Sequence, residues 1–285
     1  MRRYKHNTRF LEEKRFSAME LWIIISSLIL ALIILMPLSI NGGIENKISI
    51  PTACFIGTLS GAIVYIITFY QNLILFYIII LEILFIGVIT ALIVLWRFYR
   101  DPKRIPPKDE NTILSPADGK VIYVKKIEKG KIPFSEKKGR KFSLKDFIHT
   151  DLNQNGGHLI GIALSIIDVH VNRAPISGKI SLIKHIKGIF ISLKKKEAVI
   201  QNERVLVVMD NKHFKLGVVL IASRMVRKIV TYIQEGQEIK RGERIGMIKF
   251  GSQADLILPD YSSIKIQVRP GEKVMAGTSI IATTE

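Results

Sequence analysis

Residues 235–259, EGQEIKRGERIGMIKFGSQADLILP, decide the fold of this chain. They contain GQEIKRG at 236–242, in which two glycines, residues that readily take left-handed backbone angles, flank a short extended segment. Two apolar runs of strand length follow at 244–249 and 254–258. Gly251-Ser252 lies between these runs, and a Gly-Ser step is ordinarily a turn. The stretch therefore predicts a turn, a short strand, a second turn and two longer strands.

Two sequence echoes extend this prediction to the surrounding chain. GEKVMAG at 271–277 repeats the pattern of 236–242, and SPADGKV at 115–121 resembles APISGKI at 174–180. Paired glycines around a short strand are typical of lipoyl- and biotinyl-type barrel-sandwich folds. We therefore expect quasi-symmetric β-hairpins, with chance recurrence of common turn strings as the alternative.

Short β-type runs fill the chain after residue 98, and most are bounded by Gly, Pro, Asn or Asp. We expect strands at 120–127, 159–165, 179–186, 204–209, 214–222, 229–233, 244–249, 254–258, 264–268 and 278–282. The polar segment 130–157 predicts a long loop with a short helix at 144–148. The sequence thus predicts a mainly β, barrel-sandwich-like domain at 99–285, preceded by transmembrane α-helices.

Those helices form the anchor region predicted at 1–98. Its apolar segments are 21–40, 52–70 and 73–96, each near the length that spans the hydrocarbon of a bilayer. Glu82 is the one charge within them, and it fits either a helix contact or the headgroup level.

Flanking charge predicts the orientation of the anchor. Residues 1–20 and 97–108 are rich in Lys and Arg, whereas 41–51 contains only Lys47. The positive-inside rule therefore places the N-terminus and the β domain in the cytoplasm, at the cell's inner membrane. This orientation requires an even number of crossings, and we expect two.

Composition narrows the partners. A net charge of +18 favours an anionic partner, and the basic residues form no recognisable nucleic-acid module. We therefore expect an anionic membrane and no nucleic acid. A solvated basic face is the alternative for any single lysine. The single cysteine, Cys54, excludes an intramolecular disulfide and any multi-cysteine metal site.

Four strings in order resemble the pyruvoyl-dependent phosphatidylserine decarboxylases, in their short bacterial and archaeal form. They are FYRDPKRIPP at 98–107, SPADGKV at 115–121, DVHVNRAPISGKI at 168–180 and the stretch 235–259. Each string alone is weak, but the ordered set is specific.

The resemblance implies a self-cleaving proenzyme. Cleavage between Gly251 and Ser252 would give a beta chain, 1–251, and an alpha chain, 252–285, that stay together as a heterodimer; a further oligomer is left open. Ser252 would become the pyruvoyl group and form a Schiff base with the amine of phosphatidylserine. Carbon dioxide and phosphatidylethanolamine would then be released. No metal or pyridoxal phosphate is implied.

The same resemblance assigns three further residues. His170 matches the family's acid/base histidine, and Asp118 matches the aspartate that orients it. Arg173 stands where long-form members carry a second histidine. Either His170 serves both self-cleavage and decarboxylation, or Arg173 binds substrate. Gln253-Ala254 departs from the usual Arg-Val, which leaves the fine tuning for substrate open.

Two alternatives remain at this stage. One is decarboxylation of a related serine lipid, such as an ether-linked archaeal lipid. The other is a membrane-tethered lipoyl/biotinyl-like adaptor or carrier domain without catalysis. The carrier alternative lacks a lysine at the centre of a hairpin turn for covalent loading, and the adaptor alternative lacks a long heptad stretch.

Overall fold

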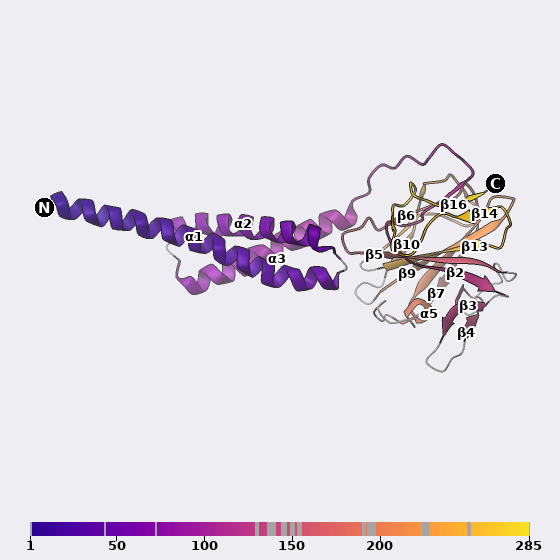
Figure 1. Cartoon of the computed structure of the whole chain (residues 1–285), viewed down its shortest axis with the longest axis horizontal. Helices are drawn as coiled ribbons and strands as arrows, with labels where there is room; N and C mark the ends of the chain where they lie inside the picture. The colour runs from indigo at the N-terminus through magenta and orange to yellow at the C-terminus, as the bar shows by residue number, and fades with distance from the viewer. Residues whose placement is uncertain are drawn as a thin grey trace. The chain divides into compact units, whose positions relative to one another are not determined.

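The computed structural model divides the chain into a helical unit, Met1–Trp96, and a β unit, Arg97–Glu285 (Figure 1). The described residues are 2–42, 44–71, 73–128, 131–135, 141–143, 147–148, 152, 156–189, 192, 198–223, 228–249 and 252–284. Of these, 2–20, 41, 131–135, 141–143 and 252 are described by their backbone alone.

The helical unit contains α1 (Arg2–Asn41), α2 (Asn46–Gln71) and most of α3 (Leu75–Tyr99). Small residues let α1 and α2 approach closely, since a Cβ added at Gly57 would lie 2.8 Å from the Cα of Leu28. Glu82 of α3 is fully buried, and its Oε1 accepts a hydrogen bond of 2.7 Å from Ser26 Oγ. The helix-contact interpretation of Glu82 therefore fits the structure.

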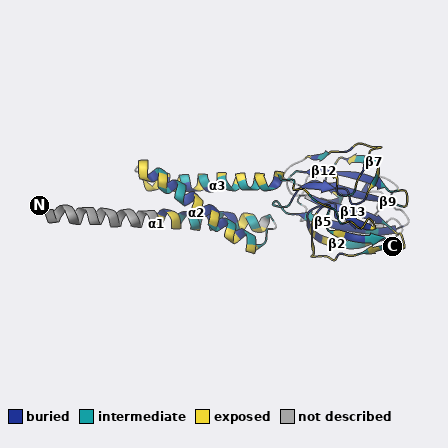
Figure 2. Cartoon of the chain, turned by 90° about the horizontal axis from the view of Figure 1, so that it is seen from above, coloured by how far each residue is buried: buried dark blue, intermediate teal, exposed yellow. Residues whose placement is uncertain are grey.

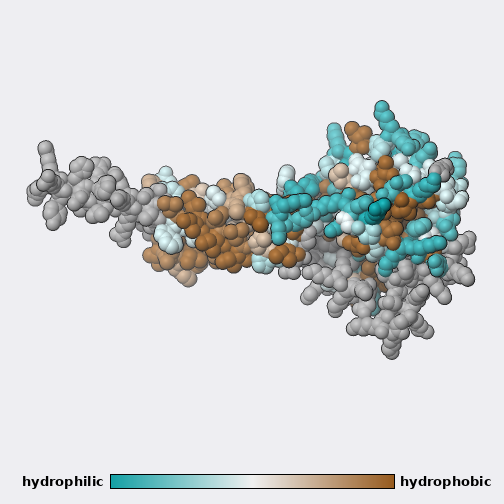
Figure 3. Space-filling view, viewed as in Figure 1, coloured by the Kyte–Doolittle hydropathy of each residue, from teal (hydrophilic) through white to brown (hydrophobic). Residues whose placement is uncertain are grey.

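All three helices are long and apolar enough to cross a membrane. Their large apolar side chains are mostly exposed, as in Trp22 (72%) and Leu75 (71%), and they give the helices yellow stripes in Figure 2 and brown surfaces in Figure 3. Such surfaces are unfavourable in water and suit lipid, so the chain is a membrane-associated protein. The number of crossings stays a prediction.

A curled ten-stranded sheet dominates the β unit. Its strands in spatial order are β11 (Glu238–Ile239), β7 (Gly178–Ile186), β8 (Arg204–Asp210), β9 (Lys215–Ile221), β13 (Ser252–Pro259), β5 (Gly156–Leu164), β2 (Gly119–Glu128), β3 (Lys131–Ser135) and β4 (Lys141–Ser143), with β15 (Lys273–Val274) also paired to β2. The central strand β13 pairs antiparallel with β9 on one side and β5 on the other. The fold prediction of a mainly β unit behind N-terminal helices is confirmed.

Two three-stranded sheets complete the β unit. One has the order β1 (Thr112–Leu114), β16 (Ile280–Thr284), β14 (Ile264–Ile266), and the other has the order β10 (Ile229–Thr231), β12 (Arg244–Ile248), β6 (Val171–Arg173). Apolar residues of these small sheets share one core with one face of the large sheet. The opposite face packs on a second core, which includes Phe147, Ile148 and residues of the short helix α5 (Ala198–Gln201). Alternation along β13 sends Leu256 to the first core and Ile257 to the second.

The sequence echoes correspond to a structural repeat. β15 pairs with the start of β2, where Val274 faces Gly119, and β11 pairs with the start of β7 in the same way, where Ile239 faces Gly178. Backbone hydrogen bonds from Gly271 N to Val121 O (2.7 Å) and from Gly236 N to Ile180 O (2.8 Å) are also equivalent. The expected quasi-symmetry is therefore present, but each copy pairs strands that are distant in the sequence, so the two copies are not hairpins.

The segment expected to be one long loop, 130–157, differs from the prediction. It contains β3, β4 and the start of β5. β3 and β4 were not predicted because their sequences are partly polar. They are the last strands of the large sheet, and the alternation of apolar and polar residues that identifies a strand is weak there. Of the helix expected at 144–148, only Phe147 and Ile148 are described, and both are helical.

Candidate active site

Ser252 begins β13, the central strand of the large sheet. Its backbone pairs with Leu164, the last residue of β5, and Gln253 pairs with Ala163 of β5 and Ile221 of β9. Gly251 lies outside the described residues, and nothing is described of the Ser252 side chain. The predicted cleavage point therefore sits where β13 enters the sheet.

His170 lies in the segment that follows β5, at the end of the strands where Ser252 pairs with Leu164. This segment follows Leu164 and begins with a turn closed by Asp168, whose Oδ2 accepts a 2.7 Å hydrogen bond from Ser165 N. The backbone of Ile248, at the end of β12, donates a 3.3 Å hydrogen bond to His170 O. Ser252 follows Ile248 by four residues, so the fold brings the backbones of His170 and Ser252 to the same end of these strands.

The ring of His170 is held in one tautomer. Its Nδ1 lies 2.8 Å from the carbonyl oxygen of Asp168, and a carbonyl only accepts hydrogen bonds, so Nδ1 carries the proton. Nε2 is therefore an acceptor. It is buried, and within the described part of the chain it has no hydrogen-bond partner.

Burial also keeps His170 neutral. The side chain is fully buried, and its ring packs on Phe98 with the two centroids 4.2 Å apart. Burial lowers the pKa of His170 to about 4, against a smaller opposing effect of the Asp168 carbonyl and carboxylate. At neutral pH, Nε2 is thus an unprotonated base that needs no prior loss of a proton.

Asp118 caps a turn and pairs with an arginine. Its Oδ1 accepts a 2.7 Å hydrogen bond from Ala276 N, and its Oδ2 forms a 2.8 Å ion pair with Arg104. In the second copy of the repeat, Ser177 Oγ accepts from Arg241 N at 3.0 Å in the equivalent turn. Among the described residues no hydrogen bond joins Asp118 to His170, so the orienting role stays a prediction.

Arg173 binds the connector between the helices and the β domain. Its Nη2 donates to Asp101 Oδ1 at 2.6 Å and to Pro102 O at 3.1 Å, and its Nη1 donates to Gly242 O at 2.9 Å. Arg244 also pairs with the Asp101 carboxylate. Arg173 would have to exchange these partners to bind a substrate, and that role likewise stays a prediction.

Comparison with known proteins identifies the family of this site. The family model described as "Phosphatidylserine decarboxylase" matches residues 92–282, which include all four predicted site residues and Gly251. The chain belongs to the phosphatidylserine decarboxylase family. It is therefore a decarboxylase, and the adaptor or carrier alternative is wrong.

Three relatives show how near the resemblance is. The chain is 40% identical over 193 residues to a "Putative archaetidylserine decarboxylase proenzyme" of Methanothermobacter thermautotrophicus, covering 68% of this chain and 82% of the relative. It is 43% identical over 197 residues to a protein of the same name from Methanocaldococcus jannaschii, covering 69% and 93%. It is 35% identical over 198 residues to the "Phosphatidylserine decarboxylase proenzyme" of Geobacter metallireducens, covering 69% and 79%.

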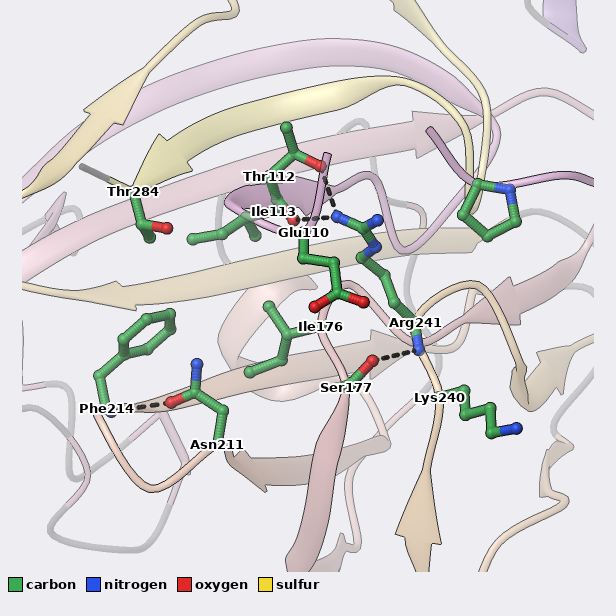
Figure 4. Close-up of a pocket in the computed structure, with 11 residues that line it drawn as sticks. Glu110, Thr112, Ile113, Ile176, Ser177, Asn211, Phe214, Lys240, Arg241 and Thr284 are labelled. Atoms are coloured by element: carbon green, nitrogen blue, oxygen red, sulfur yellow. Dashed lines mark hydrogen bonds between the residues drawn. The ribbon is translucent and has the colours of Figure 1, made fainter. Parts of the chain in front are cut away.

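A large pocket of the decarboxylase domain lies away from this site (Figure 4). Its volume is about 570 Å³, and its lining includes Phe214, Ser177, Lys240 and Arg241. Phe214 directly precedes the first residue of β9, whereas Gln253 pairs with the last residue of that strand. The Arg241 guanidinium is bound to the chain itself, for example to Thr112 Oγ1 at 2.6 Å. The pocket is thus at the far end of β9 from Ser252.

Sequence reasoning missed a buried polar cluster beside Ser252. Tyr123, Gln253 and Asp255 bond to one another on the second-core face of the sheet. An aspartate in the apolar run 254–258 was the available signal, since a charge in a central strand needs buried partners. Among the described residues no group of three or more His, Cys, Asp or Glu side chains could hold a metal ion.

Proposed function

We propose that the chain is a proenzyme that cuts itself between Gly251 and Ser252 and converts Ser252 into a pyruvoyl group. With this group it decarboxylates phosphatidylserine to phosphatidylethanolamine and CO2. The observation that carries the proposal is His170, a buried neutral base at the edge of the sheet where the Gly-Ser step enters β13.

His170 supports the cleavage chemistry through its tautomer. In the proposed step Nε2 takes the hydroxyl proton of Ser252 as Oγ attacks the carbonyl carbon of Gly251. The amide bond becomes an ester, and the amine becomes the new N-terminus. Elimination then releases the upstream carboxylate and leaves a dehydroalanine, which water hydrolyses to the pyruvoyl group and ammonia.

The pyruvoyl carbonyl supplies an electron sink for loss of CO2 from an amine substrate. The chain's own contribution is proton transfer, and we assign it to His170. Nε2 of the resting enzyme has no proton, so His170 can give back only a proton that it has accepted earlier in the reaction. Because the pKa of His170 is about 4, its protonated form is a strong acid that returns this proton readily. The proposed roles of Asp118 and Arg173 are to orient His170 and to bind substrate; each requires an exchange of the partners described above.

A membrane location fits a lipid substrate. The basic chain, with its net charge of +18, is attracted to an anionic surface, and the apolar helices keep the decarboxylase domain near it. We propose that this domain faces the cytoplasm at the inner membrane. The two cleavage fragments would form the working heterodimer.

A serine lipid with ether-linked archaeal chains is a second candidate substrate. The observation that favours it is the name archaetidylserine decarboxylase, which two relatives at 40% and 43% identity carry. Both lipids share the phosphoserine headgroup, so the same chemistry serves either. Release of CO2 from nanodiscs that contain one lipid or the other would decide between them, since only the true substrate would support rapid turnover.

A gel of the full-length protein purified in detergent tests self-cleavage. We expect two fragments from the wild type and one uncut band from Ser252→Ala. Ser262→Ala, an exposed serine of the same fragment, is the matched control and should be cut normally. A wild type that decarboxylates lipid while its chain remains whole would refute the mechanism.

A further inference from the structure

Three side chains next to the proposed cleavage point form a closed ring of hydrogen bonds, in which Gln253 and Asp255 are buried and Tyr123 is half-buried. Tyr123 Oη donates to Asp255 Oδ2 at 2.6 Å, and Gln253 Nε2 donates both to Asp255 Oδ1 at 2.7 Å and to Tyr123 Oη at 2.7 Å. The two amide hydrogens of Gln253 and the phenol hydrogen of Tyr123 are each used once within the ring.

A glycine makes room for this ring. Gly161 of β5 pairs with Asp255 on one side and with Tyr123 on the other. A Cβ added at Gly161 would come within 2.3 Å of the Tyr123 ring, so the phenol lies over this glycine and reaches the strand beyond it. The ring of hydrogen bonds thus ties β2 to β13 across β5.

Burying such a polar ring in a core has an unfavourable desolvation free energy. Asp255 is fully buried, and burial raises its pKa to about 7, while hydrogen bonds from Tyr123 and Gln253 oppose that rise. Apolar residues of similar volume usually stabilise a core as well or better. Apolar residues would not specify one orientation of the strand. Hydrogen bonds are directional, so a polar ring can fix how β13 is positioned and rotated at its start.

The ring lies where the orientation of β13 would matter for the reaction, directly after Ser252. Gln253 directly follows Ser252, and it would be the second residue of the alpha chain after cleavage. Tyr123 belongs to the beta chain, so the ring would cross from one fragment to the other.

We propose that Tyr123, Gln253 and Asp255 are positioning residues that hold residue 252 in place, first for the cut and then for decarboxylation. This inference rests on the proposed self-cleavage. It also gives Gln253, a departure from the family pattern, a role beneath the site rather than in contact with substrate.

Two variants remove donors from the ring with little change of shape, Tyr123→Phe and Gln253→Leu. Their matched controls are Tyr261→Phe and Gln267→Leu, which make the same changes at exposed positions. Precursor would be made by cell-free synthesis into nanodiscs, and the appearance of the two fragments would be followed on gels. Thermal unfolding by circular dichroism would show that each variant is folded.

We expect cleavage to slow by roughly tenfold to a hundredfold in both ring variants, because small misplacements of reacting atoms cost rates of this order. In the fraction that is cut, kcat per alpha chain should fall while KM for lipid stays unchanged. Both controls should match the wild type. A merely structural ring would lower the unfolding temperature and leave the cleavage rate and kcat unchanged, and that result would overturn the inference.

The wild type separates this inference from the proposed function. If wild-type precursor is never cut, the proposed function fails, whatever the variants do. If the wild type is cut and both ring variants are cut at its rate, only the positioning role fails.

Discussion

At the scale of single residues, His170 is the side chain whose environment says most about the reaction. The sequence identified it through a family resemblance, but its tautomer and its low pKa depend on the Asp168 carbonyl and on the packing of Phe98. Phe98 lies far from His170 in the sequence, and no local pattern predicts that contact.

The pKa of His170 predicts the pH dependence of self-cleavage. A base with the ordinary pKa of 6.5 would lose about tenfold in its neutral fraction between pH 7.5 and 5.5. With a folded-state pKa of about 4, the neutral form predominates over that whole range. Asp255 also titrates in this range, because burial raises its pKa to about 7, so the profile is measured in Asp255→Asn, which removes that titration. In this background we expect the cleavage rate of fresh precursor to change less than about twofold from pH 7.5 to 5.5 and to fall towards pH 4. An acid limb centred near pH 6.5 in Asp255→Asn would contradict the assignment.

Asp118 shows the limit of residue-level prediction. Its motif suggested one role, and the structure shows two other contacts, with Arg104 and with Ala276 N. Both partners are distant in the sequence. Arg104 lies in the segment that follows the helices and Ala276 in the glycine-flanked string 271–277, so only the folded chain brings them to Asp118.

The Arg104–Asp118 pair makes a prediction about stability. Both side chains are only 10% exposed, so Arg104→Gln would leave a carboxylate buried without its charge partner. Loss of one member of a buried pair typically costs about 3–5 kcal/mol. We expect a lower unfolding temperature in detergent by circular dichroism, whereas Lys103→Gln, at an exposed neighbour, should unfold like the wild type. Equal unfolding temperatures for the two variants would show that the pair contributes little.

At the scale of elements, repeated strings were a better guide than single strands. The two glycine-flanked strings, 236–242 and 271–277, contain β11 and β15. β11 pairs with β7, which begins in the string 174–180, and β15 pairs with β2, which begins in the string 115–121. Strands β1 and β6, each of three residues, were not predicted, because so short a run has no periodicity to detect. The structure, not the pattern, places Arg173 on β6.

Glycines of the repeat provide a test at this scale. Gly119 and Gly271 both have positive φ, 148° and 101°. A Cβ at Gly119 would lie 2.2 Å from Ala163 O, whereas a Cβ at Gly271 would meet open space. Gly271→Ala should therefore cost only backbone strain, about 1–2 kcal/mol, and Gly119→Ala should cost clearly more. Unfolding temperatures measure the difference, and equal losses would argue against the close approach of β2 and β5.

At the scale of the whole molecule, the strand arrangement would keep the proposed cut chain folded. β13 lies between β9 and β5 in the large sheet, and β14, β15 and β16 of the same C-terminal piece pair with one another or with the larger piece. The chain order of motifs predicted the cut, but only the topology shows that the smaller piece supplies the central strand.

This arrangement predicts that the fragments remain associated. After self-cleavage they should elute together on size exclusion in mild detergent, and they should separate only when urea unfolds the sheet. The elution of each fragment can be followed with a tag at either end of the chain. Separation without denaturant would contradict the position of β13 in the sheet.

The intact mass of the C-terminal fragment tests the central claim most directly. Protein purified from cells that decarboxylate the lipid would be separated under denaturing conditions and weighed by mass spectrometry. The account predicts a fragment of residues 252–285 that begins with a pyruvoyl group in place of the Ser252 amine and side chain. A fragment that begins with an unmodified serine, or an unbroken chain of 285 residues in an active preparation, would contradict it.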